Sequence, residues 1–144
     1  MLYTLGYSGW LPAALLAVAQ EHNAVVCDIR FTPLSRHPQW RQGQLATLLG
    51  ARYQHIQALG NRNYKNGGPI ALVDYEAGKE AIAALLATGQ AVILLCACAE
   101  VATCHRRLAA EQLAADFGLS VTHLLHPSRQ PGQERQASLW EDRR

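Results

Sequence analysis

The pattern of hydrophobic and polar positions predicts strands that alternate with helices along the chain. Strand patterns occur at residues 2–5, 24–28, 52–56, 91–96 and 121–125. Helical spacing, with apolar residues about every three to four positions, occurs at residues 11–21, around 45–49, at 75–88 and at 104–117. The run AVILLC at 91–96 is the most apolar, which predicts a central strand buried on both faces. This order predicts an α/β fold, a three-layer α/β/α sandwich with a mostly parallel five-stranded sheet.

The length of 144 residues suits one domain. We expect this domain to occupy residues 1–126, because the composition shifts to Pro, Gln, Arg and Ser in a tail at 127–144. The longest apolar run, 91–99, is too short for a membrane span, so no membrane partner is expected. The first residues lack a secretory signal pattern, which predicts a cytoplasmic protein whose cysteines are thiols or metal ligands rather than disulfides.

The charge is unevenly distributed, although the net charge is only +2. Residues 29–73 hold six of the 13 basic residues and none of the 11 acidic ones. Such a stretch creates a local field that attracts anions. We therefore expect a phosphate-bearing small molecule or a nucleic acid as partner.

Three polar segments follow predicted strands, and the carboxyl ends of parallel strands meet at one edge of a sheet. These segments are Gly6–Ser8, Asp28–Arg30 and the stretch from Cys96 to Arg106. We expect them to converge on one ligand-binding crevice. Three interpretations of this crevice remain open.

The first interpretation is a phosphate site. Arg30, Arg36, Arg106 and the Ser8 hydroxyl could clamp an oxyanion, because planar guanidinium groups bind phosphate with paired hydrogen bonds. Asp28 would orient Arg30 or act as a base. In the purely structural alternative, Asp28 forms an ion pair with Arg36, and aromatic residues such as Trp40 and Tyr53 pack in the core.

The second interpretation is a thiol-dependent enzyme or redox protein. A thiolate on Cys104 would be stabilised at the start of a helix, with His105 or Asp28 as general base and Arg106 as oxyanion partner. Cys96 could resolve an oxidised Cys104.

The third interpretation is a metal site. Cys96, Cys98 and Cys104 offer thiolates suited to zinc or iron, although their spacing is not that of paired Cys-x-x-Cys knuckles. Apart from this metal interpretation, the sequence predicts no cofactor.

The residues also resemble the domain of unknown function 488 family over nearly the whole chain. The shared motifs are T-x-G-x-S at Thr4, Gly6 and Ser8, D-x-R-x-x-P-x-S-R at Asp28–Arg36 with Ser35, the element from Tyr53 to Leu59 and Gly60, and a strand-end Cys96 followed by Cys104-His105-Arg106. Where many members have Glu, this chain has Cys98. The resemblance implies the fold and the position of the site, with Thr4, Gly6, Ser35, Tyr53, Cys96 and Cys98 in supporting positions.

The tail contains a short peptide that resembles the Gln-x-x-Leu-aromatic motif with which bacterial DNA-repair proteins bind the sliding clamp. Its anchors would be Gln136, Leu139 and Trp140. Alternatively, Trp140 packs on its own domain or on a second copy in a homodimer. The preferred hypothesis from the sequence is a phosphate-binding protein in a DNA-maintenance context. The alternatives are the thiol-dependent protein and a non-catalytic adaptor that docks through its tail.

Overall fold

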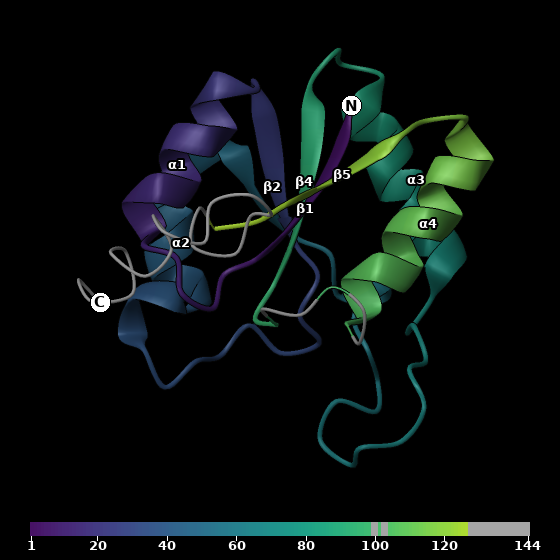
Figure 1. Ribbon diagram of the computed structural model, residues 1–144, viewed down its shortest axis with the longest axis horizontal. Helices are drawn as coiled ribbons and strands as arrows, with labels where there is room; N and C mark the ends of the chain where they lie inside the picture. The colour runs from purple at the N-terminus through teal and green to yellow at the C-terminus, as the bar shows by residue number, and fades with distance from the viewer. Residues whose placement is uncertain (99–100, 102–103, 127–144) are drawn as a thin grey trace, which may run out of the picture.

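A five-stranded, entirely parallel sheet forms the centre of the computed structural model, which describes residues 1–98, 101 and 104–126 (Figure 1). The sheet has the order β3-β2-β4-β1-β5. Its strands are β1 (Leu2–Gly6), β2 (Ala24–Asp28), β3 (Tyr53–His55), β4 (Ala91–Cys96) and β5 (Val121–Leu124). The apolar run at 91–96 is therefore the central strand, as predicted, and all six of its residues are buried.

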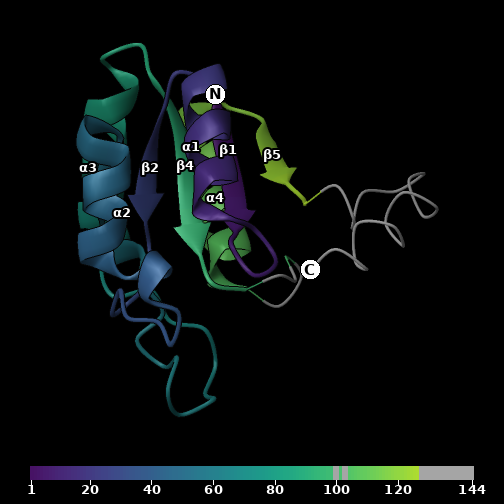
Figure 2. The same cartoon turned by 90° about the vertical axis from the view of Figure 1, so that its left-hand side faces the viewer.

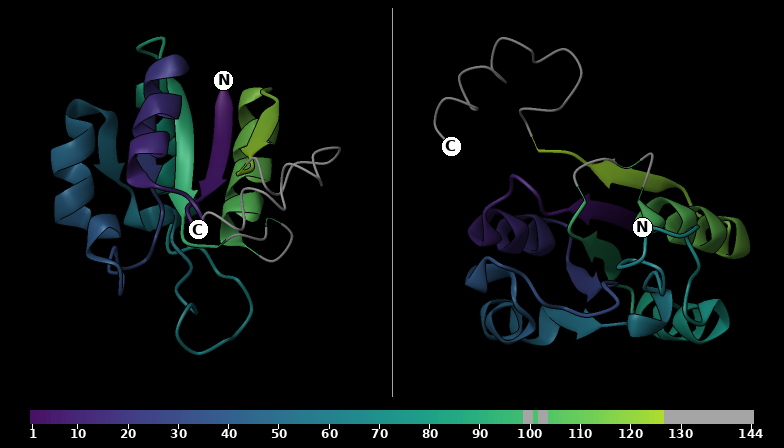
Figure 3. Two further views of the ribbon diagram at one scale, coloured as in Figure 1. Left: turned by 60° about the vertical axis from the view of Figure 1, so that its left-hand side comes forward. Right: turned by 90° about the horizontal axis from the view of Figure 1, so that it is seen from below.

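Four helices cover the two faces of the sheet, as Figure 3 shows from below. They are α1 (Pro12–Glu21), α2 (Gln42–Leu49), α3 (Tyr75–Leu86) and α4 (His105–Phe117). One face packs against Leu15 of α1 and Leu45 of α2, and the other packs against Ile82 of α3 and Leu113 of α4. The predicted three-layer α/β/α sandwich is confirmed, and the sheet is parallel throughout rather than mostly parallel.

The side chains of β4 alternate between the two faces of the sheet, so this strand contributes to both hydrophobic cores. Val92 and Leu94 contribute to the core under α3 and α4, whereas Ile93 and Leu95 contribute to the core under α1 and α2. Successive side chains of a strand point to opposite faces, so a strand covered on both faces must be apolar throughout.

The element boundaries differ from the sequence pattern at a few places. The third strand is shorter than predicted because Gly50–Arg52 forms a 3₁₀ turn that ends before Tyr53. The predicted helix at 75–88 ends at Leu86, and α4 begins after Cys104, which is its N-cap. Two further 3₁₀ turns, Pro38–Trp40 and Gln57–Leu59, lie in loops that follow β2 and β3.

The arrowheads of β1, β2 and β4 point to the same end of the molecule, and the long loop after β3 extends beyond it (Figure 2). This carboxyl edge therefore collects the segments that follow these three strands. None of the helices in the described part of the chain has the length and apolar character of a membrane span. The predicted tail at 127–144, with Gln136, Leu139 and Trp140, lies outside the described residues.

Candidate functional site

A buried ion pair lies at the end of β2. Arg30 donates to the two carboxylate oxygens of Asp28 through Nε (2.8 Å) and Nη2 (2.6 Å), and the Tyr53 hydroxyl donates to the same carboxylate at 2.7 Å. Asp28 is fully buried and Arg30 is 6% exposed. Hydrogen bonds and charge attraction from Asp28 raise the pKa of Arg30 despite its burial, so the pair is ionised. The predicted structural partner of Asp28, Arg36, was wrong, since Arg30 occupies that position.

This ion pair supports an aromatic stack. Arg30 Nη1 donates to the Tyr7 hydroxyl at 3.2 Å, and its guanidinium carbon lies 5.3 Å from the centre of the Tyr7 ring. The Tyr7 ring stacks on Trp40, with centres 4.3 Å apart and planes 8° from parallel. Trp40 is thus a core residue, in agreement with the structural alternative. Both side chains are buried, so they fix the loops after β1 and β2 relative to each other.

Three cysteines meet at the end of β4. The Sγ atoms of Cys96, Cys98 and Cys104 all lie within 4.8 Å of one another, and those of Cys96 and Cys104 are 2.9 Å apart. Cys96 and Cys104 are buried, whereas Cys98 is exposed. Cys104 caps the N-terminus of α4, where the helix dipole favours negative charge. The cluster therefore has one sulfur that faces solvent and two beneath it.

The cluster rests on a buried guanidinium. Arg106, on the first turn of α4, is 1% exposed and places Nη1 3.4 Å from Cys96 Sγ and 2.8 Å from the Cys98 carbonyl oxygen, to which it donates. Its Nε donates to the Thr4 hydroxyl at 3.3 Å. The Thr4 hydroxyl also lies 2.6 Å from Nδ1 of His123. Burial and the nearby Arg106 lower the pKa of His123, which favours a neutral ring that accepts from Thr4.

His105 lies beside the buried thiol in a defined orientation. Its Nε2 is 2.9 Å from the carbonyl oxygen of Ile29, which can only accept a hydrogen bond, so Nε2 carries the proton. In the neutral ring this leaves Nδ1 as an acceptor, and Nδ1 lies 3.8 Å from Cys104 Sγ. His105 is therefore placed to take a proton from Cys104 or return one to it.

The four thiols differ sharply in acidity. Hydrogen bonds from Cys96 and then Cys98 lower the pKa of Cys104 far below the usual thiol range. The same hydrogen bonds with Cys104 raise the pKa of Cys96 and that of Cys98. Burial, with Asp28 nearby, raises the pKa of Cys27 to about 12, which marks it as inert. Within the cluster, Cys104 is thus the thiol on which negative charge is most favoured, and Arg106 lies nearby as a counter-charge.

Three sulfurs at these separations could also hold a metal ion such as zinc or iron, for which thiolates are good ligands. The His105 nitrogens stand outside the group of mutually close ligand atoms. A tetrahedral site would therefore take its fourth ligand from elsewhere.

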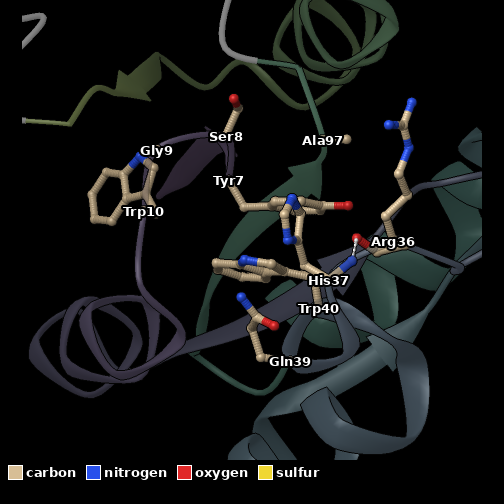
Figure 4. A pocket seen from close by; sticks show the side chains of 10 residues that line it. Tyr7, Ser8, Gly9, Trp10, Arg36, His37, Gln39, Trp40 and Ala97 are labelled. Carbon is tan, nitrogen blue, oxygen red and sulfur yellow. Dashed lines mark hydrogen bonds between the residues drawn. The ribbon is translucent and has the colours of Figure 1, made fainter. Parts of the chain in front are cut away.

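A cleft of about 480 Å³ lies next to the cluster (Figure 4). It is lined by Tyr7, Ser8, Gly9, Trp10, Ser35, Arg36, His37, Gln39, Trp40 and Ala97. The Ser8 N–H donates to the Ala97 carbonyl at 3.2 Å, which joins the loop after β1 to the cysteine segment. Arg36 and Ser8 extend on the same side of the Tyr7 ring, with Ala97 between them in this view.

The structure divides the residues predicted from sequence into three groups. Thr4, Cys96, Cys98, Cys104, His105 and Arg106 form the cysteine cluster with its supports. Asp28, Arg30 and Tyr53 form the buried ion-pair network. Ser8, Ser35 and Arg36 line the cleft. Arg30 and Arg106 do not line it, because both are buried and hydrogen-bonded to other protein groups.

Sequence reasoning missed several lining residues. His37 was not among the predicted site residues, although it directly follows Arg36, the last residue of the motif. Tyr7, Trp10 and Gln39 carried no signal of their own, because their position depends on how two loops pack together. The proximity of Tyr7 to the recognised Gly6 and Ser8 was the one usable hint.

Comparison with known proteins adds the family. A search of the curated proteins found no match. The family model described as Domain of unknown function DUF488 matches residues 13–67, a segment that runs from α1 past β3 and contains the Asp28–Arg30 pair and Arg36. The cysteine cluster lies outside this segment. The resemblance expected from the sequence motifs is thereby confirmed over residues 13–67, which are similar to the DUF488 family.

Proposed function

We propose that the protein is a thiol-dependent redox protein in which Cys98 and Cys104 form the reactive pair. The observation that carries this proposal is the arrangement of the cluster, in which Cys104, whose pKa is lowered, lies together with a solvent-exposed sulfur, a buried guanidinium and an oriented imidazole. A structural cysteine needs none of these neighbours, because buried thiols usually pack as small apolar groups. Low thiol pKa and partial exposure together are typical of reactive cysteines.

The geometry supports a dithiol–disulfide exchange with a small disulfide, RSSR. Proton transfer from Cys98 to Cys104 leaves the negative charge on the exposed sulfur. Cys98 Sγ then attacks RSSR, the sulfur–sulfur bond breaks, and RS⁻ leaves. Cys104 gives its proton to Nδ1 of His105, attacks Cys98 Sγ and expels the second sulfur of the substrate. Two electrons pass to the substrate, one protein disulfide forms, and His105 returns the proton, so the products are RSH and RS⁻.

The pH dependence of this exchange tests the proposal. Because the pKa of Cys104 is lowered, the cluster keeps its negative charge as the pH falls. We expect the rate with hydroxyethyl disulfide to change less than about threefold between about pH 8 and about pH 6, whereas a thiol of ordinary pKa, ~8.5, loses roughly 100-fold. Mass spectrometry of peptides should locate the new disulfide between Cys98 and Cys104.

Three variants complete this experiment. Cys104→Ser should abolish both the flat pH profile and the protein disulfide, and Cys98→Ser should abolish the disulfide. Cys27→Ser is the matched control, because Cys27 is buried in the sheet away from the cluster, and it should behave as the wild type. A wild-type rate that falls with pH like that of an ordinary thiol would overturn the proposal.

A second candidate function is binding of a phosphate-bearing ligand at the same edge. It is favoured by the cleft, whose lining contains Ser8 and Arg36 and no acidic residue. Equilibrium binding of adenosine monophosphate, with adenosine as control, tests it. Binding of nucleic acid, the DNA-maintenance context, docking on the sliding clamp, and zinc or iron in the cluster stay predictions from the sequence.

A further inference from the structure

We propose that the cleft selects small disulfides that carry an oxyanion, a carboxylate or a phosphate, and that Arg36 is the residue that determines this specificity. This inference rests on the proposed thiol–disulfide exchange and names its class of substrate. It has four supports: the position of the cleft, its charge, its rigidity and its size.

The cleft borders the segment that carries the exposed Cys98. Ala97 forms part of its wall, and the next residue is Cys98, the exposed member of the cluster. The backbone bond from Ser8 to Ala97 and that from Tyr7 to Cys96, at 2.9 Å, hold this wall against the loop after β1. A molecule seated in the cleft would therefore contact the residue that directly precedes Cys98.

The lining attracts anions. Arg36 and His37 are both exposed, and no Asp or Glu is among the lining residues. Arg36 makes no ion pair with any residue that the structure describes. By contrast, Arg30 is already neutralised by Asp28. An unpaired guanidinium in a cleft is a ready partner for a carboxylate or phosphate, with which it forms paired hydrogen bonds.

The loop that carries Arg36 is held in place. Arg41 Nε donates to the Ser35 carbonyl at 2.9 Å, and the His37 N–H donates to the Ser35 hydroxyl at 3.1 Å. Behind this loop, the buried Trp40 stacks on Tyr7. A site formed in advance loses little entropy when it binds its ligand.

The size favours a small molecule. A volume of about 480 Å³ falls within the range of clefts that take small ligands, about 300–1,000 Å³. The lining is also mainly polar at its rim, with Ser8, Gln39 and His37 exposed, which suits a hydrophilic substrate.

Exchange rates with three disulfides of different charge test the inference. Glutathione disulfide is anionic, hydroxyethyl disulfide is neutral and cystamine is cationic. We expect the wild type to prefer glutathione disulfide over cystamine by about tenfold, after correction for their rates with a free thiol, and to lose part of this preference at high salt. Competition by adenosine monophosphate but not by adenosine would identify phosphate as the oxyanion, and its absence would identify carboxylate.

Arg36→Gln should reduce the preference at least threefold, and Arg36→Lys should retain most of it. Lys65→Gln is the matched control, because it removes one exposed positive charge outside the lining. Equal corrected rates in the wild type, or an unchanged preference in Arg36→Gln, would overturn the inference. The thiol proposal has a separate readout, since its failure would appear as an ordinary pH profile with the neutral disulfide.

Discussion

At the scale of single residues, the costliest feature of the molecule is its buried charge. Asp28, Arg30 and Arg106 are all removed from water, which disfavours an ionised group by several kcal/mol unless partners replace the solvent. Within the described residues, every buried side-chain nitrogen and oxygen has a hydrogen-bond partner. The network therefore leaves no buried polar group of the described residues without a partner. Removing one member should leave the opposite charge buried and unpaired, which lowers the free energy of unfolding.

We predict that Asp28→Asn destabilises the protein by about 3–5 kcal/mol, because it leaves the Arg30 charge buried without its counterion. The free energy of unfolding, from urea titration, measures this change. Asp116→Asn is the matched control: Asp116 pairs with Lys79 at 3.4 Å on the surface, where solvent screens the two charges, so its loss should have a much smaller effect. A loss below about 1 kcal/mol in Asp28→Asn would contradict the assignment of this pair as a buried structural element.

The sequence allowed the site residues to be recognised, but it did not allow their burial to be predicted. Asp28, Arg30, Cys104 and Arg106 were all recognised as site residues, yet a one-letter pattern does not show whether a guanidinium faces a ligand or a buried partner. Arg30 and Arg106 face inward because Asp28, Thr4 and the Cys98 carbonyl lie there, and these contacts join distant parts of the chain. Arg36, in the same motif, faces the cleft.

At the scale of elements, the site depends on a close contact between two strand ends. A Cβ atom on Gly6, at the end of β1, would lie 1.4 Å from the Cys98 carbonyl oxygen and 2.6 Å from Arg106 Nη1. Only glycine leaves room for the cysteine segment to pass over β1 and for Arg106 to reach beneath it. Gly6, from the T-x-G-x-S motif, therefore makes room for the cysteine segment and for Arg106 of the Cys-His-Arg motif.

We predict that Gly6→Ala displaces the cysteine segment and removes the low-pKa thiolate. Thiolate ultraviolet absorbance near about pH 6, where an ordinary thiol is protonated, should be present in the wild type and lost in the variant. Gly43→Ala is the matched control, because a Cβ at Gly43 in α2 meets nothing within 4 Å and should stabilise the helix by about 0.5–1 kcal/mol. Retention of the thiolate signal in Gly6→Ala would show that the contact does not position the cluster.

The elements themselves were largely predictable from sequence, because apolar periodicity reports burial directly. The central strand and the four helices follow from it. The order of the strands does not, since periodicity contains no information about which strand lies beside which. Exchange of the β1 and β5 positions would leave this apolar pattern unchanged, yet it would separate Gly6 from Cys98.

At the scale of the whole molecule, two hydrophobic cores flank the sheet. One is formed with α1 and α2 and the other with α3 and α4, and their buried members fall between Leu2 and Leu113. Together they join both ends of the sheet into one folding unit. The domain boundary near residue 126 remains a prediction from composition.

We predict that a chain ending at His126 keeps its stability within about 1 kcal/mol of the full chain, because the buried core residues named above all precede this position. Urea unfolding of both chains measures the difference, and the rate with hydroxyethyl disulfide should be equal in both. A loss larger than about 2 kcal/mol would instead support the alternative in which Trp140 packs on its own domain or on a second copy.

The sheet order also determines when the site can form. Within the described sheet, β1 pairs with β4 and β5, and β2 pairs with β3 and β4. Leu2 of β1 therefore cannot pair until Val92 of β4, about ninety residues later in the chain, has been synthesised. During synthesis, the N-terminal strand therefore has no neighbour until β4 has left the ribosome, and such late pairing slows folding. The three clustered cysteines emerge at the end of β4 and just after it. A nascent chain thus exposes these clustered thiols only at the moment when β4 joins the two halves of the sheet.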